Sequence, residues 1–401
     1  MVNYAGFWAY KFYISNKGYM MSKPFRKRHW FLKILSYGLY DLPCPINLSV
    51  WWSFGSMLGL CLTIQIVTGF MLSFYYVPHA DMAFDSVIYI MRNVHKGWMV
   101  RSIHSNGASM FFMCIYIHIG RGLYYGSYLD KAVWNVGIAL YLMLSAEAFL
   151  GYVLPWGQMS YWGAVVISSM LTAIPYVGQT MAEWLWGGYV VNTRTLTRFY
   201  SFHFILPFLM VVVVLLHLFY LHEKGSNNPL GVSSDSMLIP FHPSYTVKDI
   251  FGFVCMLFVL MFFVCVKPEM LGNPLNFIPA DSMKTPVHIQ PEWYFLFAYT
   301  ILRSIPHKAG GIVAMLASIL VLAVMPFVHT GKFRGLAYYP IHQMLFWAFI
   351  SVFLGMTAIG MRPVMEPIYT VGQILSVIYF GLILFIPLSM FMWDKLIFKY
   401  A

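Results

Sequence analysis

Long apolar segments with almost no charge recur along the chain, separated by more polar connections. Each is close to the roughly 20 residues that an α-helix needs to cross the hydrocarbon core of a bilayer. Because lipid offers no hydrogen-bonding partners to backbone amides, such segments are expected to be helices. Eight spans are predicted, at residues 52–75, 98–125, 133–154, 199–221, 248–267, 309–329, 341–361 and 369–394.

Two connections are long, residues 155–198 and 268–308, and both are predicted on the outer side of the membrane. Long ordered loops are more often functional than filler. Residues 158–189, within the first loop, are moderately apolar but are interrupted by Pro175 and a Gly-Gly pair, which favours interfacial helices over a crossing. The predicted fold is therefore an all-α membrane protein with eight transmembrane helices, spans one to four forming a bundle, and interfacial helices in the outer loops.

Composition and charge agree with this fold class. Hydrophobic residues make up 60% of the 401 positions and charged residues only 10%, whereas about a quarter of the residues in a soluble domain are charged. The net charge of +11 gathers at the ends of spans, most densely at Lys23–Lys33. This distribution is typical of topology signals and excludes a nucleic-acid-binding stripe. It predicts both termini on the inner side. The five cysteines have no metal-ligand spacing, which excludes a disulfide or zinc framework.

Four histidines carry the most specific chemical signal. The second span contains His104 and His118, the fourth contains His203 and His217, and each pair is 14 residues apart. This is almost four helical turns, so both members of a pair face the same way, about 21 Å apart along the axis. Because one crossing separates the two spans, they run in the same direction, and His104 lies level with His203 and His118 with His217. Two facing imidazoles at each level predict two six-coordinate b-type haems.

Glycines and arginines near these histidines fit the same interpretation. The first span contains Gly55 and Gly69 and the third contains Gly137 and Gly151, again 14 residues apart. A glycine level with each histidine leaves room for a flat macrocycle, although ordinary small-residue packing is the alternative. Arginine suits the haem propionates through its bidentate fork. The candidates, each of which topological anchoring also explains, are Arg101, Arg121 and Arg198.

Other functions remain open at this point. A single intramembrane histidine is as often a packing residue as a functional one, but two matched pairs disfavour packing. A transporter that relays protons and a di-haem membrane anchor of a dehydrogenase are the competing functions. A transporter would show no haem bands in a reduced-minus-oxidised optical spectrum, and an anchor needs only one quinone site.

From about Leu42 to the C-terminus, the sequence resembles cytochrome b of the respiratory cytochrome bc complex (ubiquinol–cytochrome c reductase, complex III). The matching stretches are Trp51–Gly55, Asn106–Phe112, Gly120–Tyr128, Gly151–Met159, His222–Pro229 and Pro291–Tyr294. Equal histidine spacing and eight spans in one chain resemble the respiratory branch rather than the split chloroplast type. The compact length and the lack of a leader favour a multi-pass subunit of the mitochondrial inner membrane, with both termini in the matrix, over one of a bacterial plasma membrane.

The resemblance implies an enzyme subunit with two haem b and with ubiquinol and ubiquinone as substrates. Quinol at an outer site would give one electron to an iron–sulfur protein and one to the outer haem. The second electron would pass through the inner haem to quinone at an inner site, coupled to proton translocation. The implied partners are the iron–sulfur protein, a cytochrome c-type subunit, small subunits, a second copy of the complex and membrane lipid.

Polar residues follow the fourth span on the inner side. His222 and Asp249 are candidate donors and proton sources for a quinone, and from sequence alone a solvated loop histidine is the alternative. The resemblance assigns both to the quinone-reduction site, with Ser226 and Lys248 beside them.

On the outer side, Glu292 lies among aromatic residues after a Pro-rich loop. An interfacial aromatic belt explains Trp293 and Tyr294 but not the carboxylate, which is a candidate acceptor for a quinol proton. The resemblance assigns this segment to the quinol-oxidation site, close to the outer haem. It adds further residues that line the same pocket, namely Tyr152, Gly163 and Tyr299.

Three regions divide the chain. Residues 1–41 are predicted to form an aromatic and basic N-terminal arm and an inner-surface segment, of which the first 20 residues have no counterpart in the family pattern. Residues 42–230 are predicted to form the di-haem four-helix bundle with the inner-site loop. Residues 231–401 are predicted to form a C-terminal four-helix region with the outer quinol-site loop.

Overall fold

The computed structural model describes residues 24–399, so the predicted arm at residues 1–20 lies outside the described residues. A long helix fills each of the eight ranges that the hydrophobic pattern predicts. These helices are α4 (Phe54–Ser73), α6 (Gly97–Tyr124), α7 (Lys131–Val153), α10 (Thr193–Lys224), α11 (Ser244–Val266), α13 (Lys308–Val328), α14 (Pro340–Gly360) and α15 (Ile368–Ile397).

Within residues 24–399, seven of these helices are long and apolar enough to cross a membrane, and α6 is the exception. At 28 residues α6 has sufficient length, but its sequence includes Arg101, His104, Asn106, His118 and Arg121. Helices dominate the chain, and the protein is an integral all-α membrane protein.

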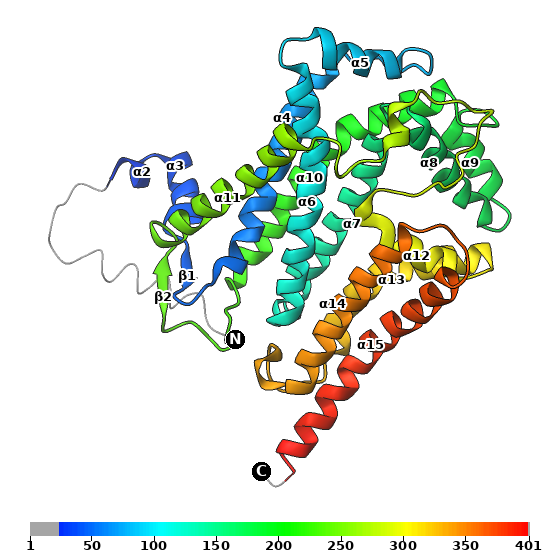
Figure 1. The fold of residues 1–401 in the computed structure, drawn as a ribbon. Coiled ribbons are helices and arrows are strands. Elements are labelled where there is room, and N and C mark those ends of the chain that lie inside the picture. Colours follow the sequence, from blue (N-terminus) through cyan, green and yellow to red (C-terminus); the bar gives the residue numbers. More distant parts are fainter. Residues whose placement is uncertain (1–23, 400–401) are drawn as a thin grey trace.

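The long helices form two groups (Figure 1). In the first, α4 packs against α6 and α7 packs against α10, while α11 lies against α4 and α6. In the second, α14 packs along α15, and the short helix α12 (Leu296–Ser304) contacts α13, α14 and α15. The α13 helix also contacts α7 and so joins the two groups. A buried cluster around Phe112 draws side chains from α4, α6, α7, α10 and α11.

Shorter elements gather at the two ends of the helices. Three helices lie at the end predicted to be outer, which is called the outer end below: α5 (Ala83–Asn93), α8 (Gln158–Ser169) and α9 (Gly178–Trp186). Of these, α8 and α9 fill the segment predicted to be interfacial. At the inner end, β1 (Pro43–Pro45) pairs antiparallel with β2 (Leu238–Pro240), with Cys44 opposite Ile239. The remaining elements are α2 (Phe25–Arg28), α3 (Trp30–Leu35), η1 (Ser36–Tyr40), η2 (Val50–Ser53), η3 (Ser127–Leu129), η4 (Met170–Ala173), η5 (Pro274–Phe277), η6 (Trp293–Phe295) and η7 (Leu336–Tyr338).

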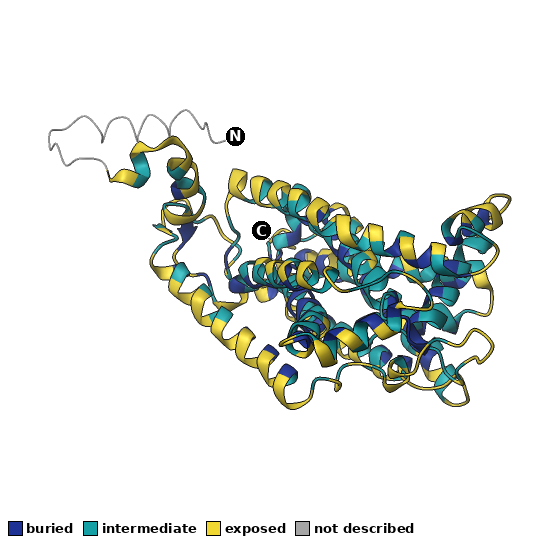
Figure 2. Ribbon diagram, turned by 90° about the horizontal axis from the view of Figure 1, so that it is seen from above, coloured by how far each residue is buried: buried dark blue, intermediate teal, exposed yellow. Residues whose placement is uncertain are grey.

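Large apolar side chains cover the outward faces of the long helices. Only 6% of the most apolar 18-residue stretch of α10 is buried, and this helix exposes Phe208, Val212 and Phe219. Figure 2 shows the same distribution over the molecule, with exposed residues on the outer helix faces and buried ones between the helices. An apolar surface of this extent is stable in contact with lipid but not with water.

Candidate functional site

The outer histidine pair faces across the space between the two helix pairs. The ring centroids of His104, on α6, and His203, on α10, lie 6.2 Å apart, and the ring planes are nearly perpendicular at 88°. An imidazole nitrogen binds a first-row metal at about 2.0–2.1 Å with its ring centroid roughly 1.2 Å behind it, so two axial imidazoles on one iron have centroids about 6.4 Å apart. The observed separation fits axial ligation of a haem iron.

Hydrogen bonds fix which nitrogen of each outer ring carries the proton. Nδ1 of His203 lies 3.1 Å from the backbone oxygen of Glu147, which can only accept, so Nδ1 is the donor and the lone pair is on Nε2. Nδ1 of His104 lies 2.9 Å from Oγ1 of Thr68, whose own proton is donated to the carbonyl of Ile64 at 2.6 Å. Both rings therefore present an unprotonated Nε2, which is the form that binds a metal.

The inner pair has similar spacing but a different environment. The ring centroids of His118, on α6, and His217, on α10, lie 6.5 Å apart at an interplanar angle of 57°. Nδ1 of His118 lies 3.3 Å from a guanidinium nitrogen of Arg121, which can only donate. Nδ1 of His217 is buried beside the backbone of Val133 but makes no hydrogen bond of acceptable geometry in the described part of the chain. The inner rings therefore match the separation of axial ligands. Unlike the outer rings, the neutral His118 ring carries its proton on Nε2 while Nδ1 accepts from Arg121, so binding a metal through Nε2 requires this contact to be exchanged.

Each predicted glycine lies against one of these histidine rings. A Cβ atom added at Gly55 or Gly69 of α4 would lie 3.4 Å from Cε1 of His118 or 2.9 Å from Cε1 of His104, respectively. On α7, an added Cβ at Gly137 would lie 3.2 Å from Cε1 of His217, and one at Gly151 would lie 2.5 Å from Cε1 of His203. The glycines thus let a histidine of one helix press against the backbone of its neighbour.

The three predicted arginines have different surroundings. Nε of Arg121 is buried with no hydrogen-bonding partner among residues 24–399, and its guanidinium lies 5.1 Å from the ring centroid of Trp52. A buried guanidinium with an unpartnered Nε fits an anionic group such as a haem propionate. Arg101 lines the outer cavity described next. Arg198 instead donates hydrogen bonds to the carbonyls of Trp184 and Leu185.

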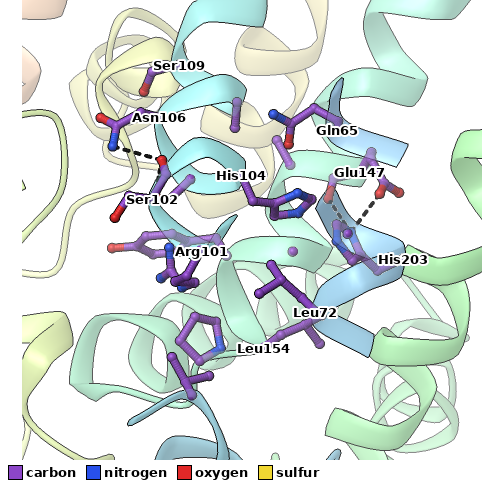
Figure 3. A pocket seen from close by; sticks show the side chains of 18 of the residues that line it. Gln65, Leu72, Arg101, Ser102, His104, Asn106, Ser109, Glu147, Leu154 and His203 are labelled. Atoms are coloured by element: carbon purple, nitrogen blue, oxygen red, sulfur yellow. Dashed lines mark hydrogen bonds and ion pairs between the residues drawn. The ribbon is translucent and has the colours of Figure 1, made fainter. Parts of the chain in front are cut away.

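One cavity joins the outer histidines to the outer loop. It has a volume of about 330 Å³, and its lining includes His104, His203, Glu292, Tyr152 and Tyr294. Figure 3 shows His104 and His203 pointing into this space, with Arg101 beside them. The same space thus contains a candidate metal-binding pair and a candidate proton acceptor.

The electrostatics of the cavity favour a proton-accepting role for Glu292. Burial raises the pKa of Glu292 to about 7, although the nearby Tyr152 hydroxyl and Arg101 act in the opposite direction. The hydroxyl of Tyr152 is buried but makes no hydrogen bond of acceptable geometry, so we regard it as a neighbour of the carboxyl rather than a bonded partner. The ring of Tyr294 stacks on Phe112 at 3.9 Å, and its carbonyl accepts a hydrogen bond from Tyr116.

Two of the predicted outer-site residues are not part of this lining. Tyr299 donates its hydroxyl to the carbonyl of Ile289 at 2.9 Å. Gly163, on α8, has no atom within 4 Å of an added Cβ. Both lie in the outer region of the molecule but outside the set of residues that enclose the cavity.

The predicted inner-site residues are spread over one edge of the molecule. His222 lies in the last turn of α10, Ser226 in the following loop, and Lys248 and Asp249 near the start of α11. Nζ of Lys248 hydrogen-bonds the carbonyl of Leu48 at 2.9 Å. None of the four hydrogen-bonds or ion-pairs with another of them within residues 24–399.

Sequence reasoning missed two residues that contact the outer histidines, Thr68 and Glu147. The carboxylate of Glu147 lies 2.7 Å from Nδ1 of His203. An available signal was that Glu147 is an acidic residue in the middle of a predicted span, where ionisable groups are costly and usually functional. Thr68 gave no such signal, because a threonine in an apolar span is ordinary.

Comparison with known proteins agrees with this geometry. Residues 39–225 match the sequence family described as "Cytochrome b/b6/petB", and residues 279–380 match "Cytochrome b(C-terminal)/b6/petD". A protein of Mytilus edulis named "Cytochrome b" is 62% identical over 350 residues, which cover 87% of this chain and 88% of that protein. A solved chain titled "Hyperthermophilic respiratory Complex III" is 32% identical, with a TM-score of 0.85 over 91% of this chain and 98% of its own. This chain belongs to the cytochrome b family.

Proposed function

We propose that this chain is the core cytochrome b subunit of a ubiquinol–cytochrome c reductase. It oxidises quinol on the outer side and reduces quinone on the inner side, coupled to proton translocation, with two haem b as cofactors. Family membership and the likeness to a chain of a respiratory complex III support this function. The observation that carries it is the presence of two facing histidine pairs with centroid separations of 6.2 and 6.5 Å.

The four histidines would hold the haems through Nε2, which for His118 requires Arg121 to release Nδ1. The four glycines would allow the rings to sit close to the neighbouring helix. Arg101 and Arg121 are the favoured cations for propionates, because Arg198 already bonds two backbone carbonyls. When bound, the two haems supply one-electron redox centres at two depths in the membrane.

At the outer site, Glu292 would accept a proton from the quinol hydroxyl. Its position in the same cavity as His104 and His203 brings the proton acceptor close to the outer ligands. Tyr152 and Tyr294 would shape the wall against which the quinol ring packs. Gly163 and Tyr299, which the resemblance assigns to this pocket, would act from outside the lining by supporting the surrounding loop.

At the inner site, His222 and Asp249 would exchange protons with the bound quinone at the membrane edge. Lys248 and Ser226 would contribute to the same site. The hydrogen bond from Lys248 to the carbonyl of Leu48 means that this lysine anchors the start of α11 unless it exchanges that partner for the quinone.

The membrane arrangement follows from the same assignment. We infer that α6 is an eighth crossing, since its polar residues face the haem-binding space, and that both termini lie in the matrix of a mitochondrion. The regions 1–41, 42–230 and 231–401 then correspond to an inner arm, the di-haem bundle and the outer quinol-site region. The partners would be an iron–sulfur protein, a cytochrome c-type subunit, small subunits and a second copy of the complex.

A reduced-minus-oxidised optical spectrum of the purified complex tests this proposal. We expect two b-type components, of which His217→Leu removes the inner one. His222→Leu is the matched control on the same helix and should keep both components, because His222 is not a ligand. A spectrum without b-type bands would favour a proton-relaying transporter and would overturn the proposal.

A further inference from the structure

The outer ligand His203 has a carboxylate as its immediate neighbour. Oε1 of Glu147 lies 2.7 Å from Nδ1 of His203, and the backbone oxygen of the same residue lies 3.1 Å from it. Figure 3 shows both contacts between Glu147 and the ring of His203. The side chain of Glu147 is only 12% exposed and that of His203 only 20%, so the contact is shielded from solvent.

Helix geometry explains why this contact forms. Glu147 and Gly151 are four residues apart on α7 and therefore lie on the same face, one turn from each other. Because Gly151 has no side chain, the His203 ring can approach α7 closely, and an added Cβ would lie only 3.1 Å from Nδ1. The ring thus comes within reach of the backbone oxygen and of Oε1 of Glu147.

The other three candidate haem ligands have no carboxylate hydrogen-bonded or ion-paired to them within the described residues. His104 bonds the hydroxyl of Thr68 and His118 lies beside the cationic Arg121. Nδ1 of His217 lies beside the backbone of Val133 without a well-formed hydrogen bond among the described residues. The outer level therefore has a carboxyl group in direct contact with one ligand, which the inner level lacks. Other charges lie at both levels: Arg101 near His104, Arg121 beside His118, and Asp130 within electrostatic reach of His217.

We propose that Glu147 is a positioning residue that holds His203 and lowers the reduction potential of the outer haem. The Nδ1–H of His203 faces both the backbone oxygen and the carboxylate of Glu147, and a carboxylate beside this proton makes the imidazole a more basic ligand, which stabilises the oxidised iron. A negative charge in a low-dielectric interior acts in the same direction. The effect favours electron movement from the outer to the inner level. This inference rests on the proposed function, because it requires a haem bound by His203.

An optical redox titration of the purified complex tests the role of Glu147. In Glu147→Gln the side chain keeps its size and an acceptor oxygen but loses its charge. We expect the ratio of reduced to oxidised outer haem at a fixed potential to rise about tenfold, which for one electron is about 59 mV. The potential of the inner haem should not change. Ser145→Ala is the control on the same helix, because Ser145 bonds the carbonyl of Tyr141 instead.

The outcomes separate this inference from the proposed function. A wild-type complex without two b haems would overturn the proposed function itself. A wild-type complex with two haems and an unchanged outer potential in Glu147→Gln would overturn only the role of Glu147. Loss of the outer haem alone in this variant would support the positioning role. Loss of both haems would count against it, because the effect would then be a general structural one.

A second variant tests the same physics at the inner level. Val133 is four residues before Gly137, as Glu147 is four residues before Gly151. Val133→Glu therefore places a carboxyl group one turn from the glycine that contacts His217. We expect the inner haem to shift toward its oxidised form, with the outer haem unchanged. An inner potential equal to that of the wild type would contradict the inference.

Discussion

Two opposing effects act on the pKa of Glu292: burial raises it, and the nearby cation Arg101 lowers it. Removal from water raises the pKa of the carboxyl to about 7, and the influence of Arg101 is too small to reverse the shift. A carboxyl group with this pKa can both accept and release a proton near neutral pH, which a fully exposed glutamate does poorly. Its side chain is therefore suited to a proton-transfer step.

The pH dependence of quinol oxidation tests this residue. Below about pH 7 the carboxyl is protonated and cannot accept, so the wild-type rate should rise as the pH increases through 7. Glu292→Gln should remove this rise and lower the rate at pH 8 by about 100-fold, the usual scale of general base catalysis. Glu183→Gln, on the outer helix α9, should retain the wild-type profile. A wild-type rate that falls between pH 6 and 8 would contradict the assignment.

At the scale of helices, four glycines decide how closely α4 approaches α6 and α7 approaches α10. The distance from an added Cβ to the nearest histidine atom differs among them, from 2.5 Å at Gly151 to 3.4 Å at Gly55. A separation below 3.0 Å requires the histidine ring to move, whereas 3.4 Å is close to ordinary contact. The same substitution should therefore have different results at these positions.

Alanine substitutions measure that difference. Gly151→Ala should displace His203 and destabilise the outer site by about 1–3 kcal/mol, the usual cost of overpacking, with reduced outer-haem content. Gly55→Ala should leave the haem content near the wild-type value. The measurement is haem per chain in purified protein. Equal losses in the two variants would mean that the glycines do not act through the histidine rings.

The proposed crossing of α6 requires that its polar residues turn toward the other helices and away from lipid. Its polar positions contact the histidine sites or line the outer cavity. If α6 crosses the membrane, cysteines introduced at its two ends should be labelled from opposite sides of sealed vesicles. His95→Cys, just before α6, and Lys131→Cys, beyond its other end at the first residue of α7, are suitable because both positions are exposed. Labelling of both from one side would exclude the crossing.

At the scale of the whole molecule, the sequence determines the helix positions well and the side-chain neighbours less well. Helices occupy all eight predicted ranges, because hydrophobic length is a local property of the chain. Equal spacing was sufficient to place His104 opposite His203 and His118 opposite His217. The first result depends on hydrophobic length, and the second depends on helical periodicity and on the common direction of the two helices.

Features that depend on helix rotation and on loop paths were not predictable. Arg198 turns to the carbonyls of α9, and Tyr299 bonds Ile289 rather than lining the cavity. The contact of Glu147 with His203 requires the close approach of α7 and α10, which no periodicity reports. Sequence spacing therefore predicted which histidines face each other, but not which groups contact the other side of their rings.

The number of haems per chain tests the central claim most directly. It is measured as the ratio of haem b to protein in the purified complex, by pyridine haemochrome absorbance against amino-acid analysis. Two facing imidazole pairs at two depths predict two haem b per chain. A ratio of one or fewer in fully assembled protein would contradict the account.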